Sequence, residues 1–392
     1  MNRRLLLLVL CQGFFLTNNV TFIAINGLVG LRLAPSAWLA TLPITAYVAG
    51  GALFAGLVGR HQRAWGRQRA FQLGLCVAIA TTALCAWAAL SGQFWLLVAG
   101  TLLAGYYNAN AGLYRFAATE LVEPPFKEKA ISWVLAGGIL GAVAGPNLAR
   151  LTRTALPVEF VAAYAALAGV ALASLLTISF IRFPPLVLPT PAAPGRKLAE
   201  IAAQPVFIVA AVACALGYGV MNLLMAATPI AMAMCTHPFE NTALVLEWHV
   251  LGMFVPSFFT GSLIKRFGAL RVMALGLVLE ASCIAVALSG VELMRFLVAL
   301  FTLGVGWNFL FIGGTALFTQ AYRPEEKTKA QAALDTIIFS TMTITSFSSG
   351  ALVTTQGWTW LNLGSIAPVL LIGAALLWFA ARQRAALRVR PV

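Results

Sequence analysis

Three side chains that can bind and release a proton lie deep inside long apolar stretches of this sequence. Glu247 and His249 share one stretch, and Asp335, the only aspartate of the chain, lies in another. An ionisable group at mid-membrane costs about 2.5 to 3.5 kcal/mol to insert, so it normally faces a cavity or a partner. A carboxyl that is neutral in one state and charged in another can couple a proton gradient to a change of shape. We therefore take these three residues as candidates for proton coupling.

Each candidate also has a structural interpretation. Asp335 can form an ion pair with Lys329 or Lys127, and His249 can be a packing residue with satisfied hydrogen bonds. Glu280, at the centre of a further apolar stretch, is expected to make a hydrogen bond between helices rather than to carry protons.

A second set of residues combines amide groups with aromatic rings. An amide both donates and accepts hydrogen bonds, and a ring beside it offers a flat face to a planar or cationic solute. Hydrogen bonding between helices is the alternative for any single asparagine. Taken together, the set predicts a substrate-binding site made of Asn18, Tyr107, Asn108, Arg115, Tyr218, Asn222, Trp307 and Asn308.

Composition places these residues in a membrane. The chain of 392 residues is 60% hydrophobic and 10% charged, and its mean hydropathy is +0.88. This leaves too little polar surface to cover a soluble globule. We therefore expect an all-α membrane protein that crosses the lipid bilayer many times.

Other classes of protein are disfavoured. The formal charge of +14 does not indicate a nucleic-acid partner, because the basic residues lie in the gaps between apolar runs and not on one folded face. Six cysteines without a C-x-x-C pair predict neither a disulfide framework nor a metal site. No cofactor is expected. One aspartate and three histidines are too few for a membrane-embedded enzyme with paired acids or histidine-rich loops, so no enzymatic activity is expected.

Twelve runs are long enough to cross a bilayer as helices, which takes about 20 residues each. They lie near residues 5–30, 37–59, 70–90, 93–118, 130–150, 157–182, 204–232, 241–264, 270–289, 291–320, 328–353 and 358–381. The widest gap is rich in proline, as is typical of a linker. The expected division is an amino-terminal six-helix bundle over 1–183, a cytoplasmic linker over 184–203 and a carboxy-terminal six-helix bundle over 204–392.

The two bundles are related by an internal repeat. A shift of 200 positions places Asn108 on Asn308, Thr119 on Thr319, Pro124 on Pro324, Lys127 on Lys327 and Lys129 on Lys329. Related halves built from apolar helices indicate a secondary transporter, whose substrate site lies between the repeats near the bilayer midplane.

Lysine and arginine predict the orientation. With the amino terminus in the cytoplasm, most of the 26 basic residues fall in segments on the cytoplasmic side. The positive-inside rule therefore predicts cytoplasmic termini in a multi-pass protein of the cell membrane, the inner membrane of a bacterium. We expect a monomer.

Two charged loops carry a recurring motif. In the later loop it comprises Gly261, Lys265, Arg266, Gly268 and Arg271, and in the earlier loop Gly66 and Arg69 close it. With this motif and its helix pattern, the whole chain resembles the major facilitator superfamily of secondary transporters, whose loop reads G-x-x-x-D-R-x-G-R-R. The family's acid, which latches the outward-facing state, is replaced here by Lys265.

The fifth apolar run resembles the glycine and proline motif of family members that export by antiport. It contains Gly137, Gly141, Gly145 and Pro146. Glycines four residues apart form a smooth stripe that a neighbouring helix can approach closely, and proline can kink the helix. Ordinary membrane packing is the alternative.

The family resemblance implies a fold and a way of working. We expect twelve transmembrane helices in two pseudo-symmetric six-helix bundles, carrying a small organic solute by rocker-switch alternating access. Proton-coupled efflux by antiport is the first expectation, and proton-coupled uptake of a nutrient or metallophore by symport is the second. A lipid flippase and a non-transporting receptor are the alternatives from other classes.

Overall fold

The computed structural model describes residues 2–123, 126–184 and 195–388, and over these ranges the chain is helical without a β-strand. The helices of the first part are α1 (Arg3–Leu33), α2 (Leu42–Ser91), α3 (Phe94–Ala111), α4 (Tyr114–Ala118), α5 (Lys127–Thr152) and α6 (Val161–Ser179). Those of the second part are α7 (Leu198–Ala202), α8 (Pro205–Met234), α9 (Phe239–Phe254), α10 (Ser257–Phe267), α11 (Ala269–Leu288), α12 (Leu293–Phe318), α13 (Lys327–Thr355), α14 (Gly357–Gly364) and α15 (Ile366–Arg388). Short 3-10 turns, η1 (Ala37–Leu39) and η3 (Pro324–Glu326), precede α2 and α13.

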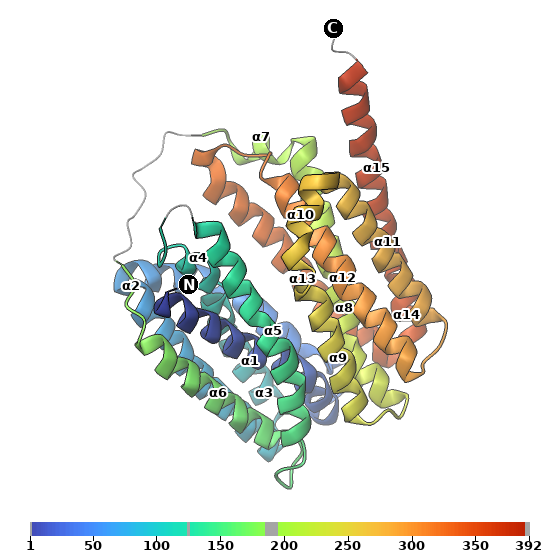
Figure 1. Cartoon of the computed structure of the whole chain (residues 1–392). Coiled ribbons are helices and arrows are strands. Elements are labelled where there is room, and N and C mark those ends of the chain that lie inside the picture. Colours follow the sequence, from blue (N-terminus) through green and yellow to red (C-terminus); the bar gives the residue numbers. More distant parts are fainter. Residues whose placement is uncertain (1, 124–125, 185–194, 389–392) are drawn as a thin grey trace.

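The helices form two groups that lie side by side (Figure 1). We call α1 to α6 the first group and α8 to α15 the second group. The end of the molecule that carries α7 and the start of α13 is the linker side, and the opposite end is the far side. At the start of the chain, Asn2 donates a hydrogen bond to the carbonyl oxygen of Leu121 at 2.7 Å. The last helix, α15, ends on the linker side. The expected division at 184–203 stays a prediction, and residues 185–194 lie outside the described ranges.

The apolar helices confirm an all-α membrane fold. Among the described residues, nine helical segments are long and apolar enough to cross a membrane, or ten if α9 and α10, bent by 41°, form one span. The 55-residue segment Ala37–Ser91 counts once among the nine, although about 20 residues suffice for a crossing. The expected twelve is reached only if the bent pair is counted as one span, this segment is counted as two and α3 is added.

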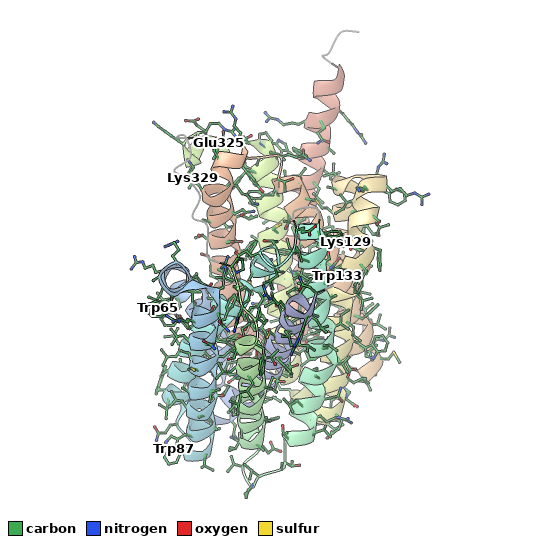
Figure 2. The ribbon with its side chains drawn as sticks, turned by 60° about the vertical axis from the view of Figure 1, so that its left-hand side comes forward. Trp65, Trp87, Lys129, Trp133, Glu325 and Lys329 are labelled. Atoms are coloured by element: carbon green, nitrogen blue, oxygen red, sulfur yellow. The ribbon has the colours of Figure 1, made fainter. Side chains whose placement is uncertain are left out.

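Two tryptophans point outward from α2 at different heights (Figure 2). Trp65 lies near its bend and Trp87 near its far-side end, and their exposed fractions are 49% and 60%. Tryptophan is enriched where membrane meets water. The helix that follows the bend rises by about 30 Å from Arg67 to Trp87, which matches the hydrocarbon thickness of about 30 Å.

The two motif loops bend the chain at matching glycines. Gly66 interrupts α2 with φ 77° and ψ 170°, and Gly268 separates α10 from α11 with φ 86° and ψ 150°. This region of backbone space is essentially restricted to glycine. The sequence match between the loops is therefore also a match of backbone conformation. The other residues of the motif, Arg69, Gly261, Lys265, Arg266 and Arg271, are exposed.

An acid outside the motif holds the earlier loop. Arg67, next to the bend of α2, pairs with Glu120 just after α4, with Nη2 2.6 Å from Oε1. Arg67 also donates to Gln62 at 3.2 Å, and Gln62 donates to Asn110 of α3 at 2.9 Å. These bonds tie the loop to helices of its own group.

The linker is fastened to the second group by Arg196. Its guanidinium pairs with Glu326 at 2.7 Å, its backbone N–H donates to the same carboxylate at 2.9 Å, and Lys329 donates to its carbonyl oxygen. Hydrogen bonds from the Arg196 side chain and the Arg323 backbone hold the pKa of Glu326 below its ordinary value. Figure 2 shows Glu325 and Lys329 at this end of α13.

The glycine stripe of α5 lies against α1. A Cβ placed on Gly141 would lie 2.5 Å from the Cβ of Leu16 and 2.6 Å from the next backbone nitrogen of α1. The carbonyl oxygen of Gly145 accepts a hydrogen bond from Thr21 of α1 at 2.8 Å. Such a close approach of two backbones requires residues without side chains. Pro146 follows within the same helix.

Contacts between the two groups gather on the far side. Thr41, before α2, donates from Oγ1 to the carbonyl oxygen of Ser346 at 2.7 Å and accepts from the N–H of Gly350 at 2.9 Å. The rings of Phe160 and Phe239 meet edge to face, with centroids 5.2 Å apart. The far side is therefore closed in this structure.

Replacement of Gly141 by alanine tests the contact between α1 and α5. The added Cβ has no room, so we expect a destabilisation of about 1 to 3 kcal/mol, seen as a lower melting temperature of the purified protein in detergent. Gly169→Ala is the matched control, because a Cβ there meets no atom within 4 Å. Equal melting temperatures for the two variants would contradict the close packing.

Candidate functional site

Six predicted site residues lie on helices that meet between the two groups. Asn18, Tyr107 and Arg115 belong to α1, α3 and α4, and Tyr218, Trp307 and Asp335 belong to α8, α12 and α13. Arg115 is within electrostatic range of both Asp335 and Tyr218. This interaction places α4 of the first group opposite α8 and α13 of the second.

Phe254 of α9 connects the two sides of this set. Its ring centroid lies 6.4 Å from that of Trp307, and it packs against a buried cluster of the first group that contains Phe15 and Tyr107. The rings of Phe15 and Tyr107 stand edge to face at 5.6 Å. The residues of α1, α3, α9 and α12 therefore belong to one neighbourhood.

Four of the six side chains carry buried polar atoms that have no hydrogen-bond partner among the described residues. These atoms are Nδ2 and Oδ1 of Asn18, the hydroxyl of Tyr107, Nε of Arg115 and Nε1 of Trp307. The Tyr107 hydroxyl lies near Asn18, but the two do not meet in hydrogen-bond geometry. Each unpaired buried group costs about 1 to 3 kcal/mol, so their concentration here favours a ligand that supplies the partners.

An aromatic wall stands beside these polar atoms. Trp307 and Phe311 are one turn apart on α12 and share a helix face, and their rings are stacked at 5.1 Å with an interplanar angle of 11°. Tyr218 stands edge-on to both rings, with centroid distances of 5.1 and 5.5 Å. Such rings can pack against a flat, largely apolar solute.

Two of the predicted asparagines are bonded between helices. Asn308 accepts a hydrogen bond from Thr260 and donates to the Ser257 hydroxyl and to the Met253 carbonyl oxygen, each at 2.7 Å. The Nδ2 of Asn222 lies 2.8 to 3.0 Å from three oxygen atoms of α13. Both residues show the bonding of the inter-helix alternative, and their part in substrate binding stays a prediction.

Asn108 differs from its counterpart in the second half. It is half-buried, and its Nδ2 lies 3.0 Å from the place where a Cβ on Gly51 would stand. Its side chain therefore packs directly on the backbone of α2.

Two of the proton-coupling candidates have partners in other helices. Glu247 accepts a hydrogen bond from Nδ2 of Asn147 at 2.9 Å, which joins α9 of the second group to α5 of the first. His249 is fully buried and donates from Nδ1 to the carbonyl oxygen of Leu300 at 2.6 Å. Its Nε2 has no hydrogen-bond partner among the described residues.

Asp335 is exposed between the groups. It interacts electrostatically with Arg115, although the two are not in ion-pair contact. Lys329, one of its expected partners, donates instead to the carbonyl oxygen of Arg196. The side chain of Lys127, the other, lies outside the described residues.

Two residues that make contacts here, Phe311 and Asn147, were not predicted as site residues from the sequence. Phe311 lies four positions after Trp307, and the helical period alone indicates that the two rings share a face. Asn147 directly follows the proline of the α5 motif, but its partner lies 100 positions away. No local signal indicates such a partner.

Comparisons with known proteins agree with this architecture. A family profile described as Major Facilitator Superfamily matches residues 237–392. The chain is 39% identical over 364 residues to the riboflavin transporter RfnT of Brucella anthropi, covering 92% of this chain and 91% of that protein. It is 27% identical over 378 residues to the uncharacterized MFS-type transporter YddS of Bacillus subtilis, covering 92% and 87%.

Solved structures share the fold at low sequence identity. A bacterial homologue of the iron transporter ferroportin in an inward-facing state has a TM-score of 0.72 at 15% identity, covering 96% of this chain and 98% of that one. An auto-inhibited peptide transporter of the POT family has a TM-score of 0.69 at 13% identity, covering 100% and 98%. Together with the apolar helices, these relatives show that the chain is a multi-pass membrane transporter and belongs to the major facilitator superfamily.

Proposed function

We propose that this protein carries riboflavin, or a solute with the same flat ring system, across the cell membrane by alternating access. The observation that carries this proposal is the buried carboxamide of Asn18, whose nitrogen and oxygen both lack partners among the described residues in the neighbourhood of the aromatic wall. The name of the relative from Brucella anthropi, a riboflavin transporter 39% identical to this chain, supports the choice of solute.

The chemistry of a flavin matches these groups. One edge of its ring system is an imide, with an N–H donor between two carbonyl acceptors. The amide of Asn18 can donate to one carbonyl and accept from the N–H, and the Tyr107 hydroxyl can serve the other carbonyl. The flat ring then packs against Trp307 and Tyr218, and the unpaired Nε of Arg115 is a donor for a hydroxyl of the sugar-alcohol chain.

Alternating access follows from rocking of the two groups around this site. We place the linker side in the cytoplasm, because exposed basic residues such as Arg69 and Arg271 lie in the loops on that side. With the far side closed by Phe160 and Phe239, the arrangement corresponds to an inward-facing state. Opening to the outside requires these rings, and the bond between Asn147 and Glu247, to separate.

We propose that protons drive the movement. Asp335 is the leading carrier, because its carboxyl is exposed between the groups and faces Arg115. Protonation of Asp335 would remove the negative charge that interacts with Arg115, so the two groups would be held together differently in the two protonation states. Glu247 and His249 stay candidates for the relay.

The direction of transport has two candidates. The glycine and proline motif of α5 supports export of the solute in exchange for protons. A vitamin as the solute favours uptake together with protons.

Replacement of Asn18 by alanine tests the binding site. We expect the Kd for riboflavin, measured by quenching of its fluorescence on purified protein, to rise roughly tenfold to hundredfold, because hydrogen bonds to buried groups are worth about 1 to 3 kcal/mol. Asn26→Ala, two turns further along the same helix, is the matched control. It should lower the melting temperature, because the hydrogen bond from the Tyr164 hydroxyl is lost, and change the Kd less than about twofold. An equal loss of affinity in both variants would refute the assignment of Asn18.

Replacement of Asp335 by asparagine tests proton coupling in proteoliposomes with a pH gradient. The parent protein should accumulate riboflavin on the acidic side if it is an antiporter and on the alkaline side if it is a symporter. In Asp335→Asn we expect exchange at equal pH to persist while accumulation driven by the gradient falls about tenfold or more. Glu325→Gln removes an exposed carboxylate on the same side of the molecule and should behave like the parent. An unchanged response in Asp335→Asn would exclude it as the coupling residue.

A further inference from the structure

Glu280 is a carboxyl group enclosed in the second group without a partner. Its side chain is fully buried, and both carboxyl oxygens lack a hydrogen-bond partner among the described residues. The expected hydrogen bond between helices is therefore not formed in this structure. Such a group requires an explanation beyond packing, because a buried acid without partners is unfavourable in protein and in lipid.

Glycines on two neighbouring helices provide the space for this carboxyl. A Cβ on Gly217 of α8 would lie 3.6 Å from Glu280 Oε1, and a Cβ on Gly306 of α12 would lie 3.1 Å from its Cγ. Gly306 also approaches the backbone of Gly276, so α11 and α12 are in close contact at this level. The acid thus occupies a junction of α8, α11 and α12.

This junction lies directly behind the aromatic wall. The residue after Gly217 is Tyr218, and the residue after Gly306 is Trp307. A change in the size, charge or hydration of the Glu280 carboxyl therefore acts on the backbones that carry both rings. Conversely, a shift of these helices during rocking changes the environment of the carboxyl.

Among the described residues, no cation lies beside Glu280. Lys265 and Arg266, at the end of α10 that precedes α11, are exposed. α8 has no charged residue, and α12 has one, Arg295, which is half-exposed beside Glu292 on the far side and lies about 16 Å along the helix from Gly306. On α11 itself Arg271 is about 14 Å away along the axis. α15, which meets α11 at Gly373, carries its arginines (Arg382, Arg384 and Arg388) on the linker side.

The other titratable groups on α8 and α11 near this level are uncharged in their ordinary forms. Cys283, one turn further along α11, is within electrostatic reach of Glu280. On α8, Tyr218 packs on Trp307 and Phe311, and the Cys214 thiol donates to the Phe311 carbonyl oxygen at 3.8 Å. Because neither a cation nor a hydrogen-bond donor contacts the carboxyl within the described part of the chain, the ionised form has nothing to stabilise it in this arrangement. The neutral acid is the form that the junction accommodates.

We propose that Glu280 is a proton-binding site that couples the protonation of the second group to the position of the aromatic wall. This rests on the proposed function. In the inward-facing arrangement the group is a neutral carboxylic acid. When α8 and α12 move apart at the two glycines, water reaches the carboxyl, which releases one proton to the solvent and becomes a carboxylate. Rebinding of one proton is needed before the junction can close again.

Glu280→Gln tests this inference, because the amide has the shape of the neutral acid and cannot release a proton. In proteoliposomes we expect riboflavin binding and exchange at equal pH to stay within about twofold of the parent, and accumulation driven by a pH gradient to fall about tenfold or more. Glu292→Gln is the matched control, because that carboxylate is exposed on the far side. Accumulation by Glu280→Gln with the pH response of the parent would overturn the proposal.

Infrared spectroscopy tests the same site without a transport assay. At neutral pH the parent protein should show the carbonyl band of a protonated carboxyl that is absent from Glu280→Gln and from Glu280→Met, a second variant that fills the junction without a polar group. A parent spectrum identical to those of both variants in this region would overturn the proposal. If the parent protein shows this band but does not transport riboflavin, the proposed function is contradicted while the proton-binding site at Glu280 is supported.

Discussion

The structure depends on one constraint, namely that a polar atom buried within a bilayer has to find a partner. Most polar side chains of the membrane helices meet it inside the chain: threonines donate to the carbonyl one turn earlier, as Thr228 does at 2.7 Å, and Asn308 uses both ends of its amide. Against this background the unpaired atoms of Asn18, Tyr107 and Trp307 stand out. Where unpaired groups from two helix groups converge, a ligand that completes their bonding is the simplest physical account.

The same constraint explains how the two groups can move. Within the first group, α1 and α5 approach each other so closely that only glycine fits between them, and this interface has no room to slide. Contacts between the groups are of another kind, with the hydroxyl of Thr41 on α13, the amide of Asn147 on Glu247 and the edge of Phe160 on Phe239. Single hydrogen bonds and ring edges are worth about 1 kcal/mol each, so they can break and re-form as the two groups rock.

The second group concentrates its chemistry on two helices. α8 and α12 present aromatic rings to the proposed solute site on one face and glycines to Glu280 on the other. Solute and proton would therefore act on the same backbone segments from different sides. This arrangement provides a physical route for coupling that needs no contact between the solute and the acid, because a rigid helix transmits a displacement from one face to the other.

Composition, apolar periodicity and the repeat determined the membrane class, the helical fold and the family. Each of these features can be read from the sequence without knowing which residues are in contact. The glycines of the two motif loops were also readable, and Gly66 and Gly268 have matching backbone angles. Only the tertiary structure decided which of several identical residue types are bonded. Asn18 and Asn308 were both predicted as substrate contacts, yet Asn308 bonds to Ser257 and Thr260 from another part of the chain, whereas the amide of Asn18 has no partner among the described residues. Hydrogen bonding depends on atoms brought together from distant positions, and so does the isolation of Glu280 among α8, α11 and α12.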